Sequence, residues 1–157
     1  MKGLFDLTSA DDLCSKLEHD AVRVRDNPAN AFAAFDFVVT AWHLLEWRYP
    51  GNIGRATRDA LCVRFPILLV CEHLAVGVKH FEAQNPKLGS VATTRRESVW
   101  GKDVWDPRVW SPGFWKDDLV VQLDGVAQST IGDRITVLHL VDLALAFWRV
   151  EGGCPKA

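Results

Sequence analysis

The chain of 157 residues lacks a strong excess of charge of either sign. Its 18 Lys and Arg residues face 20 Asp and Glu residues, which gives a formal net charge of -2 at pH 7 and a pI of about 6.2. This balance offers no electrostatic footprint for duplex DNA or for an anionic membrane. We therefore expect neither as a partner, whereas a protein partner, RNA and a homo-oligomer all stay open.

Clustered cysteines, long apolar runs and a secretion signal are also lacking. The four cysteines are far apart and form no CxxC pair: Cys14, Cys62, Cys71 and Cys154. This spacing argues against a zinc knuckle, and we expect reduced thiols. The longest apolar stretch, residues 32–47, still carries four polar or charged side chains, and the N-terminus turns acidic within six residues. Neither a spanning helix nor a signal sequence fits, so we predict a cytoplasmic protein.

The common catalytic signatures are missing as well. The sequence contains no GxSxG, GxxxxGK[ST], HExxH or GxGxxG motif. The usual hydrolase, nucleotide-binding and metalloprotease chemistries are therefore not indicated, and whether the protein is an enzyme stays open.

Helical periodicity dominates residues 1–85. Thr8 or Ser9, followed three residues later by an aspartate, is typical of a capping box and starts a helix that runs to Asn27. Asn27-Pro28 predicts the start of the next helix, which runs to Tyr49 and is apolar on most of its circumference, as expected of a central helix. Two further helices are predicted over residues 55–64 and from Pro66 to about residue 83.

The residue pattern changes after residue 86. The β-branched stretches 91–94 and 119–123 predict strands, and Asp124-Gly125 predicts a two-residue hairpin turn between the second of these and residues 126–130. Thr136 can cap a last helix over residues 136–150, which we expect to pack on the central helix. The sequence thus predicts one α+β domain, a bundle of four or five helices with a small antiparallel β-meander inserted before the last helix.

Four tryptophans recur every five residues within the predicted segment of turns: Trp100, Trp105, Trp110 and Trp115. A spacing of five fits neither a strand nor a helix, and prolines and a glycine interrupt it. One interpretation is an aromatic binding surface, with Trp105 and Trp110 among the ligand-binding candidates. The alternative is a loop that buries its indoles over one end of the helices.

A narrow polar stripe follows the central helix. Asp36, Thr40 and His43 lie within about 60° of one another on a helical wheel, and on the next long helix His73 and His80 are seven residues apart. If the two stripes face each other, they bring together one oxygen and three nitrogen ligands for a divalent transition metal: Asp36, His43, His73 and His80. A metal-free polar network and plain solvent exposure are the alternatives.

A family resemblance enters with the segments FDFVVTAWHLLEW and CEHLAVGVKHF. They resemble a set of uncharacterised bacterial helical proteins with a Thr-Ala-x-His helix and a Gly-x-Lys-His-Phe helix. That set is distantly similar to the HEPN helical domains of RNA-cleaving toxins and phage-defence systems. The resemblance covers about residues 28–83 and implies a helical ligand- or RNA-associated module, with Asp36, Thr40, His43 and Lys79 as ligand-binding candidates.

HEPN ribonucleases carry an Arg followed after a short interval by a His, and Arg134 and His139 fit this spacing. A guanidinium and a general base at the start of a helix suit phosphodiester cleavage. The alternative is that His139, Asp142 and Arg149 form a solvated row of ordinary helix pairs. We therefore expect a cytosolic interaction module of HEPN-like type without a resident cofactor and with catalysis unproven. The second hypothesis is a metal-dependent enzyme or a metal sensor.

Overall fold

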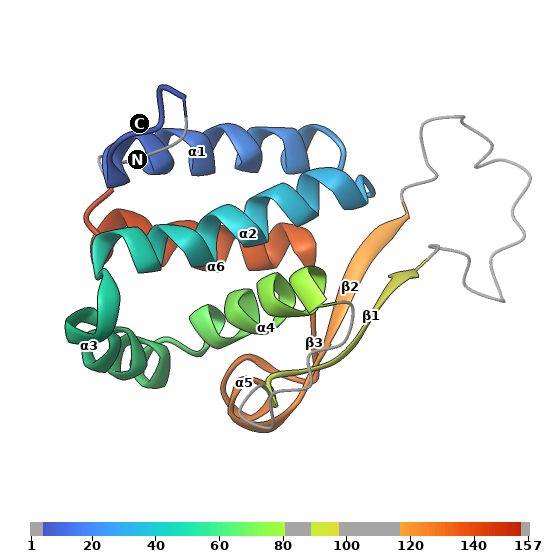
Figure 1. The fold of residues 1–157 in the computed structure, drawn as a ribbon. Coiled ribbons are helices and arrows are strands. Elements are labelled where there is room, and N and C mark those ends of the chain that lie inside the picture. Colours follow the sequence, from blue (N-terminus) through green and yellow to red (C-terminus); the bar gives the residue numbers. More distant parts are fainter. Residues whose placement is uncertain (1–4, 81–88, 98–116, 155–157) are drawn as a thin grey trace, which may run out of the picture.

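Helices and three short strands follow one another in the computed structural model, which describes residues 5–80, 89–97 and 117–154 and, for residues 78–80, the backbone alone (Figure 1). The elements of this part of the chain are α1 (Ala10–Asp26), α2 (Ala31–Arg48), α3 (Gly51–Arg64), α4 (Pro66–His80), β1 (Val91–Glu97), β2 (Asp118–Leu123), α5 (Gly125–Ile131), β3 (Arg134–Thr136) and α6 (Val137–Val150). The predicted α+β fold is confirmed, with a helical bundle and a small antiparallel sheet.

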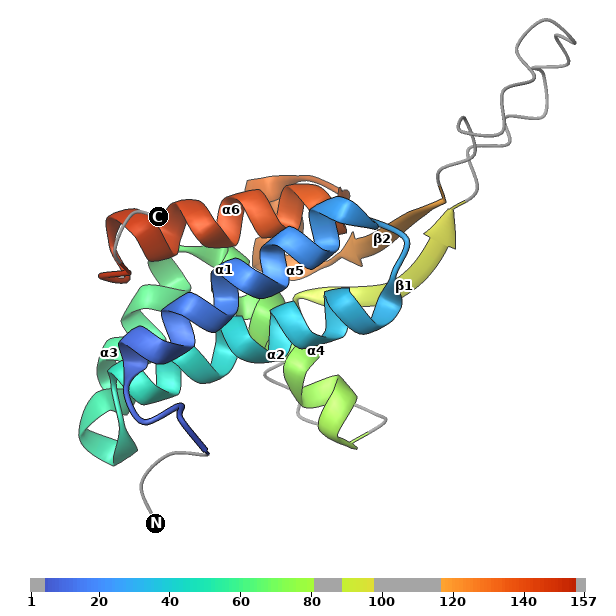
Figure 2. The same ribbon diagram turned by 90° about the horizontal axis from the view of Figure 1, so that it is seen from above.

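Helix α2 lies at the centre of the bundle, as its apolar circumference predicts. It packs on α1, α4 and α6, and Figure 2 shows α1 lying across both α2 and α6. The side chains of Phe37, Leu44 and Leu45 are fully buried along α2, and among the described residues Trp148 of α6 is the largest fully buried side chain. The last helix therefore packs on the central helix, as expected.

Two helix starts illustrate how capping decides the boundaries. The capping box of α1 is confirmed: the Ser9 hydroxyl accepts from the backbone N–H of Asp12, and the Asp12 carboxylate accepts from the N–H of Ser9. The predicted start of α2 at Asn27-Pro28 is wrong. Asn30 caps this helix, because its side-chain oxygen accepts from the N–H groups of the second and third helical residues.

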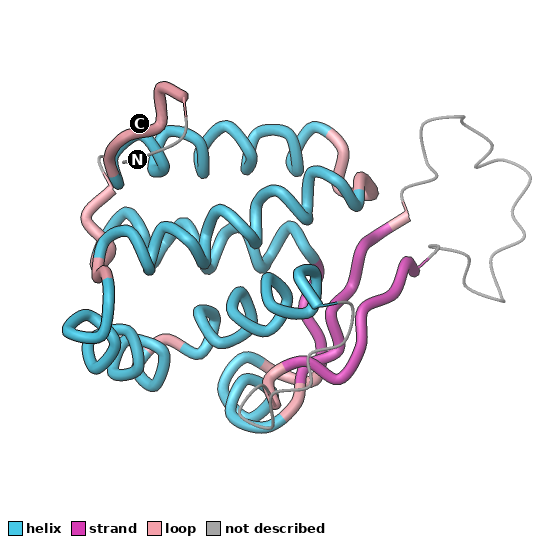
Figure 3. Tube along the Cα trace, in the orientation of Figure 1, coloured by secondary structure: helices cyan, strands magenta, loops and turns pink. Residues whose placement is uncertain are grey.

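The three strands gather at one end of the bundle in the order β1-β2-β3, with antiparallel pairing throughout (Figure 3). The predicted hairpin at Asp124-Gly125 is wrong. The Asp124 carboxylate instead caps α5 by accepting from the N–H of Gly125, whose φ of 55° suits a glycine. The chain returns to β2 through β3, and Thr136 then caps α6 as predicted.

The expectation of four reduced cysteines is wrong for two of them. Cys14 of α1 and Cys154, after α6, form a disulfide with their Cα atoms 5.6 Å apart. A separation of 140 residues in the sequence gives no sign of this proximity. Cys62 and Cys71 are free and buried, and burial raises the pKa of each thiol to about 12, so both are unreactive at neutral pH.

Within the described ranges, no single helix is long and apolar enough to cross a membrane. Only α3 together with residues 66–77 of α4 reaches that length and composition, and these two segments are bent by 115° where they meet.

Candidate functional site

The polar stripe of α2 faces α1. The Thr40 hydroxyl lies 2.8 Å from a carboxylate oxygen of Asp20 in α1, and the Asp36 carboxylate accepts from the Arg23 guanidinium at 2.6 Å. The stripe had been expected to face α4. Helices α2 and α4 are neighbours as predicted, but the polar stripe of α2 lies on the side that meets α1.

Asp20 is the centre of this α1–α2 network. Its side chain is only 2% exposed, and its carboxylate accepts from the Lys16 ammonium at 2.5 Å. The ammonium also donates to the Thr40 hydroxyl at 2.8 Å. A buried carboxylate is tolerated only when a cation and hydrogen-bond donors compensate its lost hydration, and Lys16 and Thr40 provide both.

A groove of about 360 Å³ opens above this network. We call it the α1–α2 groove, and its lining combines polar groups with apolar walls: Leu7, Leu13, Lys16, Asp36, Val39, Thr40, His43 and Trp47. Three of the residues predicted to bind a ligand, Asp36, Thr40 and His43, therefore share one depression. The side chain of a fourth, Lys79, lies outside the described residues, as do Trp105 and Trp110.

The three predicted metal ligands whose side chains are described do not gather at one point. Asp36 and His43 line the α1–α2 groove, and the His43 Nδ1 lies 2.8 Å from a carboxylate oxygen of Glu46. His73 turns to the sheet, where its Nδ1 accepts from the backbone N–H groups of Ser90 and Val91 at 3.3 and 3.1 Å. In the described part of the chain, no three His, Cys, Asp or Glu side chains are placed to hold a metal ion, and the His80 side chain is not described.

The His73 contact makes a prediction about pH. Desolvation lowers the pKa of His73, and only a neutral ring can accept at Nδ1. The stability from this contact is therefore present above the unfolded-state pKa of about 6.5 and is lost as the pH falls towards the lower folded-state pKa. The urea midpoint of the wild type should fall from about pH 7.5 to about pH 5.5 more steeply than that of His73→Gln, which cannot titrate. The exposed His19→Gln is the control, and equal slopes for the wild type and His73→Gln would refute the assignment.

Arg134 and His139 do line one depression, of about 240 Å³, beside the start of α6. Arg134 belongs to β3 and not to the helix, and its guanidinium pairs with the Glu97 carboxylate at 3.1 Å. Asp118 lines the same depression. Arg95 also pairs with Glu97, so a phosphodiester would have to displace this shared carboxylate from Arg134. The alternative of a solvated row with pairs inside the helix also differs from the structure. Asp142 and Arg149 form ion pairs with residues of α1.

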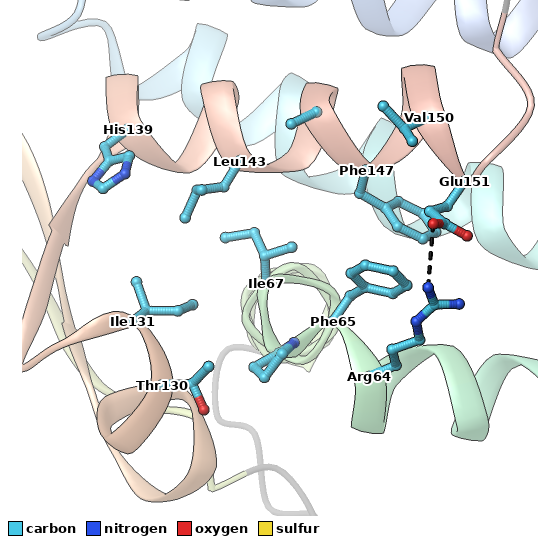
Figure 4. A pocket seen from close by; sticks show the side chains of 12 residues that line it. Arg64, Phe65, Ile67, Thr130, Ile131, His139, Leu143, Phe147, Val150 and Glu151 are labelled. Carbon is cyan, nitrogen blue, oxygen red and sulfur yellow. Dashed lines mark hydrogen bonds and ion pairs between the residues drawn. The ribbon is translucent and has the colours of Figure 1, made fainter.

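A larger groove, which the sequence did not reveal, lies between α4, α5 and α6 (Figure 4). Its volume is about 570 Å³, and we call it the apolar groove after its main lining: Phe65, Pro66, Ile67, Ile131, Leu143, Ala146, Phe147 and Val150. His139 stands at one end, and at the other end Arg64 and Glu151 form an ion pair at 3.3 Å. The available signal was the row of residues 143, 146 and 150 on α6, a second apolar row beside the buried face of this helix.

Aromatic contacts stiffen the end of the apolar groove next to α3. The rings of Phe65 and Phe147 lie 5.0 Å apart between centroids, and the Arg64 guanidinium lies 4.9 Å above the Phe65 ring. Such tilted ring pairs and cation–π contacts each stabilise the geometry by about 1 kcal/mol. This wall is therefore in place before any ligand arrives.

Comparison with family models, with curated proteins and with solved structures finds no match for this chain. Function is therefore inferred from the geometry of the two grooves and of the depression at Arg134.

Proposed function

We propose that the protein is a ligand-binding module whose apolar groove takes a small, mostly apolar molecule with one polar group. The observation that carries the proposal is the combination of volume and lining. A volume of about 570 Å³ lies in the range of small-molecule sites, and such sites typically combine apolar walls with a few polar groups.

The polar ends of the groove differ in what they can offer to a ligand. Arg64 and Glu151 already neutralise each other. His139 is exposed at the opposite end, and no hydrogen bond to its imidazole is formed in the described part of the chain. The imidazole can donate or accept, so we assign the polar group of the ligand to the His139 end and its apolar body to Leu143 and Phe147.

Filling the groove tests this proposal. Ala146 is exposed and lines the groove, so Ala146→Trp places an indole in the space without touching the core. With 1-anilinonaphthalene-8-sulfonate as a fluorescent probe, we expect Ala146→Trp to weaken binding about tenfold or more, a loss of about 1.4 kcal/mol. The exposed Ala60→Trp in α3 is the matched control and should bind the probe like the wild type.

Both variants should unfold at the wild-type temperature, which separates a filled groove from a loosened fold. Equal binding of the probe by Ala146→Trp and the wild type would overturn the proposal. So would a wild type that binds no probe.

RNA association of the HEPN-like type is the second candidate. What favours it is that Arg134 and His139 line one depression. It has less support than the apolar groove, because Glu97 occupies the Arg134 guanidinium. Arg134→Ala distinguishes the two: it should reduce retention of a mixed RNA pool if RNA binds here, and it should leave binding of the fluorescent probe unchanged.

The redox state of Cys14 and Cys154 distinguishes a reducing compartment from an oxidising one. A cytosolic protein, as predicted from the sequence, would keep these thiols reduced, whereas a disulfide is typical of oxidising compartments. We propose that the protein works in its oxidised form. Trapping free thiols in intact cells with an alkylating reagent, before lysis, distinguishes the two states.

A further inference from the structure

The α1–α2 groove is a second site, separate from the apolar groove in both its residues and its chemistry. We propose that it binds a small uncharged heteroaromatic ring through an edge that carries a carbonyl next to an N–H. The proposal does not depend on the function assigned to the apolar groove.

The charges of the groove favour a ligand without net charge. The ammonium of Lys16 is balanced by Asp20, and the guanidinium of Arg23 by Asp36. At the rim, the Glu46 carboxylate accepts a hydrogen bond from the His43 ring. An anion would meet the Asp36 carboxylate and a cation would meet the Lys16 ammonium, so either one would lose hydration without gaining a net opposite charge.

Besides the ring nitrogens of His43 and Trp47, two polar atoms of the groove can recognise a ligand. The Lys16 ammonium has three N–H donors, of which one is directed to Asp20 and one to Thr40. Its side chain is 36% exposed, so the third donor can reach a carbonyl in the groove. The Asp36 carboxylate uses Oδ2 for Arg23, and within the described residues Oδ1 has no partner, so Oδ1 can accept from an N–H. A donor beside an acceptor matches a lactam or imide edge.

The apolar walls of the α1–α2 groove explain why the proposed ligand is a ring. Leu13 and Val39 supply apolar surface, and the Trp47 side chain, 37% exposed, supplies an indole face at the rim. Stacking of a heteroaromatic ring on such a face is favourable and tolerant of the identity of the ring. A volume of about 360 Å³ is near the lower end for small-molecule sites and accommodates a single or fused ring.

The hydrogen-bonded polar groups around Thr40 in the groove are held in place before a ligand binds. Thr40 is 3% exposed, and its hydroxyl is held by Lys16, by Asp20 and by the backbone carbonyl of Asp36. Such preorganisation saves the cost of ordering the side chains upon binding. The site is therefore built from interactions that the fold itself requires.

Two methylated uracils test whether the groove recognises a carbonyl next to an N–H. In 1-methyluracil the N–H between two carbonyls is free, whereas in 1,3-dimethyluracil a methyl group replaces it. We expect 1-methyluracil to shift the amide NMR signals of α1 and α2 in a saturable way and to bind about tenfold or more tightly than 1,3-dimethyluracil, because the dimethyl compound cannot donate to Asp36.

Matched variants locate the site. Asp36→Ala removes the acceptor together with an ion pair that is about 40% exposed, and we expect it to weaken 1-methyluracil binding about tenfold. Asp142→Ala removes the comparable Arg25–Asp142 pair outside the groove and should bind like the wild type. If Asp36→Ala does not fold, Trp47→Ala replaces it, with a similar loss expected from the missing ring contact.

Three results would overturn the proposal: equal binding of the two uracils, no saturable binding of either, or wild-type affinity in both Asp36→Ala and Trp47→Ala. Ala146→Trp separates this proposal from the function assigned to the apolar groove. It should leave 1-methyluracil binding unchanged even where it abolishes binding of the fluorescent probe.

Discussion

Loss of the Cys14–Cys154 disulfide is expected to lower the free energy of unfolding by about 4 kcal/mol. The bond joins residues 140 positions apart, so it restricts nearly the whole unfolded chain. A crosslink of this span lowers the entropy of the unfolded state far more than that of the folded state. Urea unfolding of the wild type and of the double variant Cys14→Ser/Cys154→Ser, followed by circular dichroism, measures the difference.

Reduction of the disulfide in the wild type provides a control for the double variant. Dithiothreitol should lower the urea midpoint of the wild type to that of the double variant and should have no effect on the double variant itself. Cys62 and Cys71 do not interfere, because their buried thiols have a pKa of about 12 and do not react in the folded state. A wild-type midpoint that is insensitive to dithiothreitol, with free thiols detected at Cys14 and Cys154, would contradict the bond.

The disulfide does not hold the C-terminal turn alone. The Arg48 guanidinium donates to the backbone carbonyl of Gly153 at 3.0 Å and to the Asp11 carboxylate at 3.1 Å. The backbone N–H of Cys154 donates to the carbonyl of Trp148. We therefore expect the reduced protein to keep its fold at neutral pH and to lose stability without losing its helices.

Local signals in the sequence predicted several helix boundaries. They failed at α3, which begins at Gly51 and not at residue 55, and they failed where two signals competed. Thr136 was recognised as a cap, and the capping box of α1 was recognised with Thr8 and Ser9 both open as its first residue. Asn27 and Asn30 are both good caps, and the proline after Asn27 favoured the wrong one. Asp124-Gly125 suits a hairpin turn and a helix start equally, and only the pairing of β2 with β3 decides between them.

The candidate site was predicted in part for a related reason. Helical periodicity correctly placed Asp36, Thr40 and His43 on one face of α2, but it contains no information about which neighbour that face meets. The partners Lys16 and Asp20 belong to a helix whose amphipathic pattern looked ordinary. The apolar groove was missed because Leu143 appears in the sequence as a core residue, and only packing shows which apolar side chains remain partly uncovered.

Trp148 should be one of the most costly single side chains to remove. Its indole is fully buried, it meets the Phe147 ring edge-on at 4.9 Å between centroids, and it packs so closely on Gly152 that a Cβ there would lie 2.2 Å from the ring. Trp148→Ala removes this apolar surface and leaves a cavity, so we expect a loss of about 3 to 5 kcal/mol in the free energy of unfolding.

Trp47→Ala is the matched control, because it deletes the same side chain from a position that is 37% exposed. A surface position of this kind should cost under about 1 kcal/mol. Urea unfolding of both variants, compared with the wild type, gives the two losses. Similar losses for Trp47→Ala and Trp148→Ala would contradict the placement of Trp148 in the core, and with it the packing of α6 that forms one wall of the apolar groove.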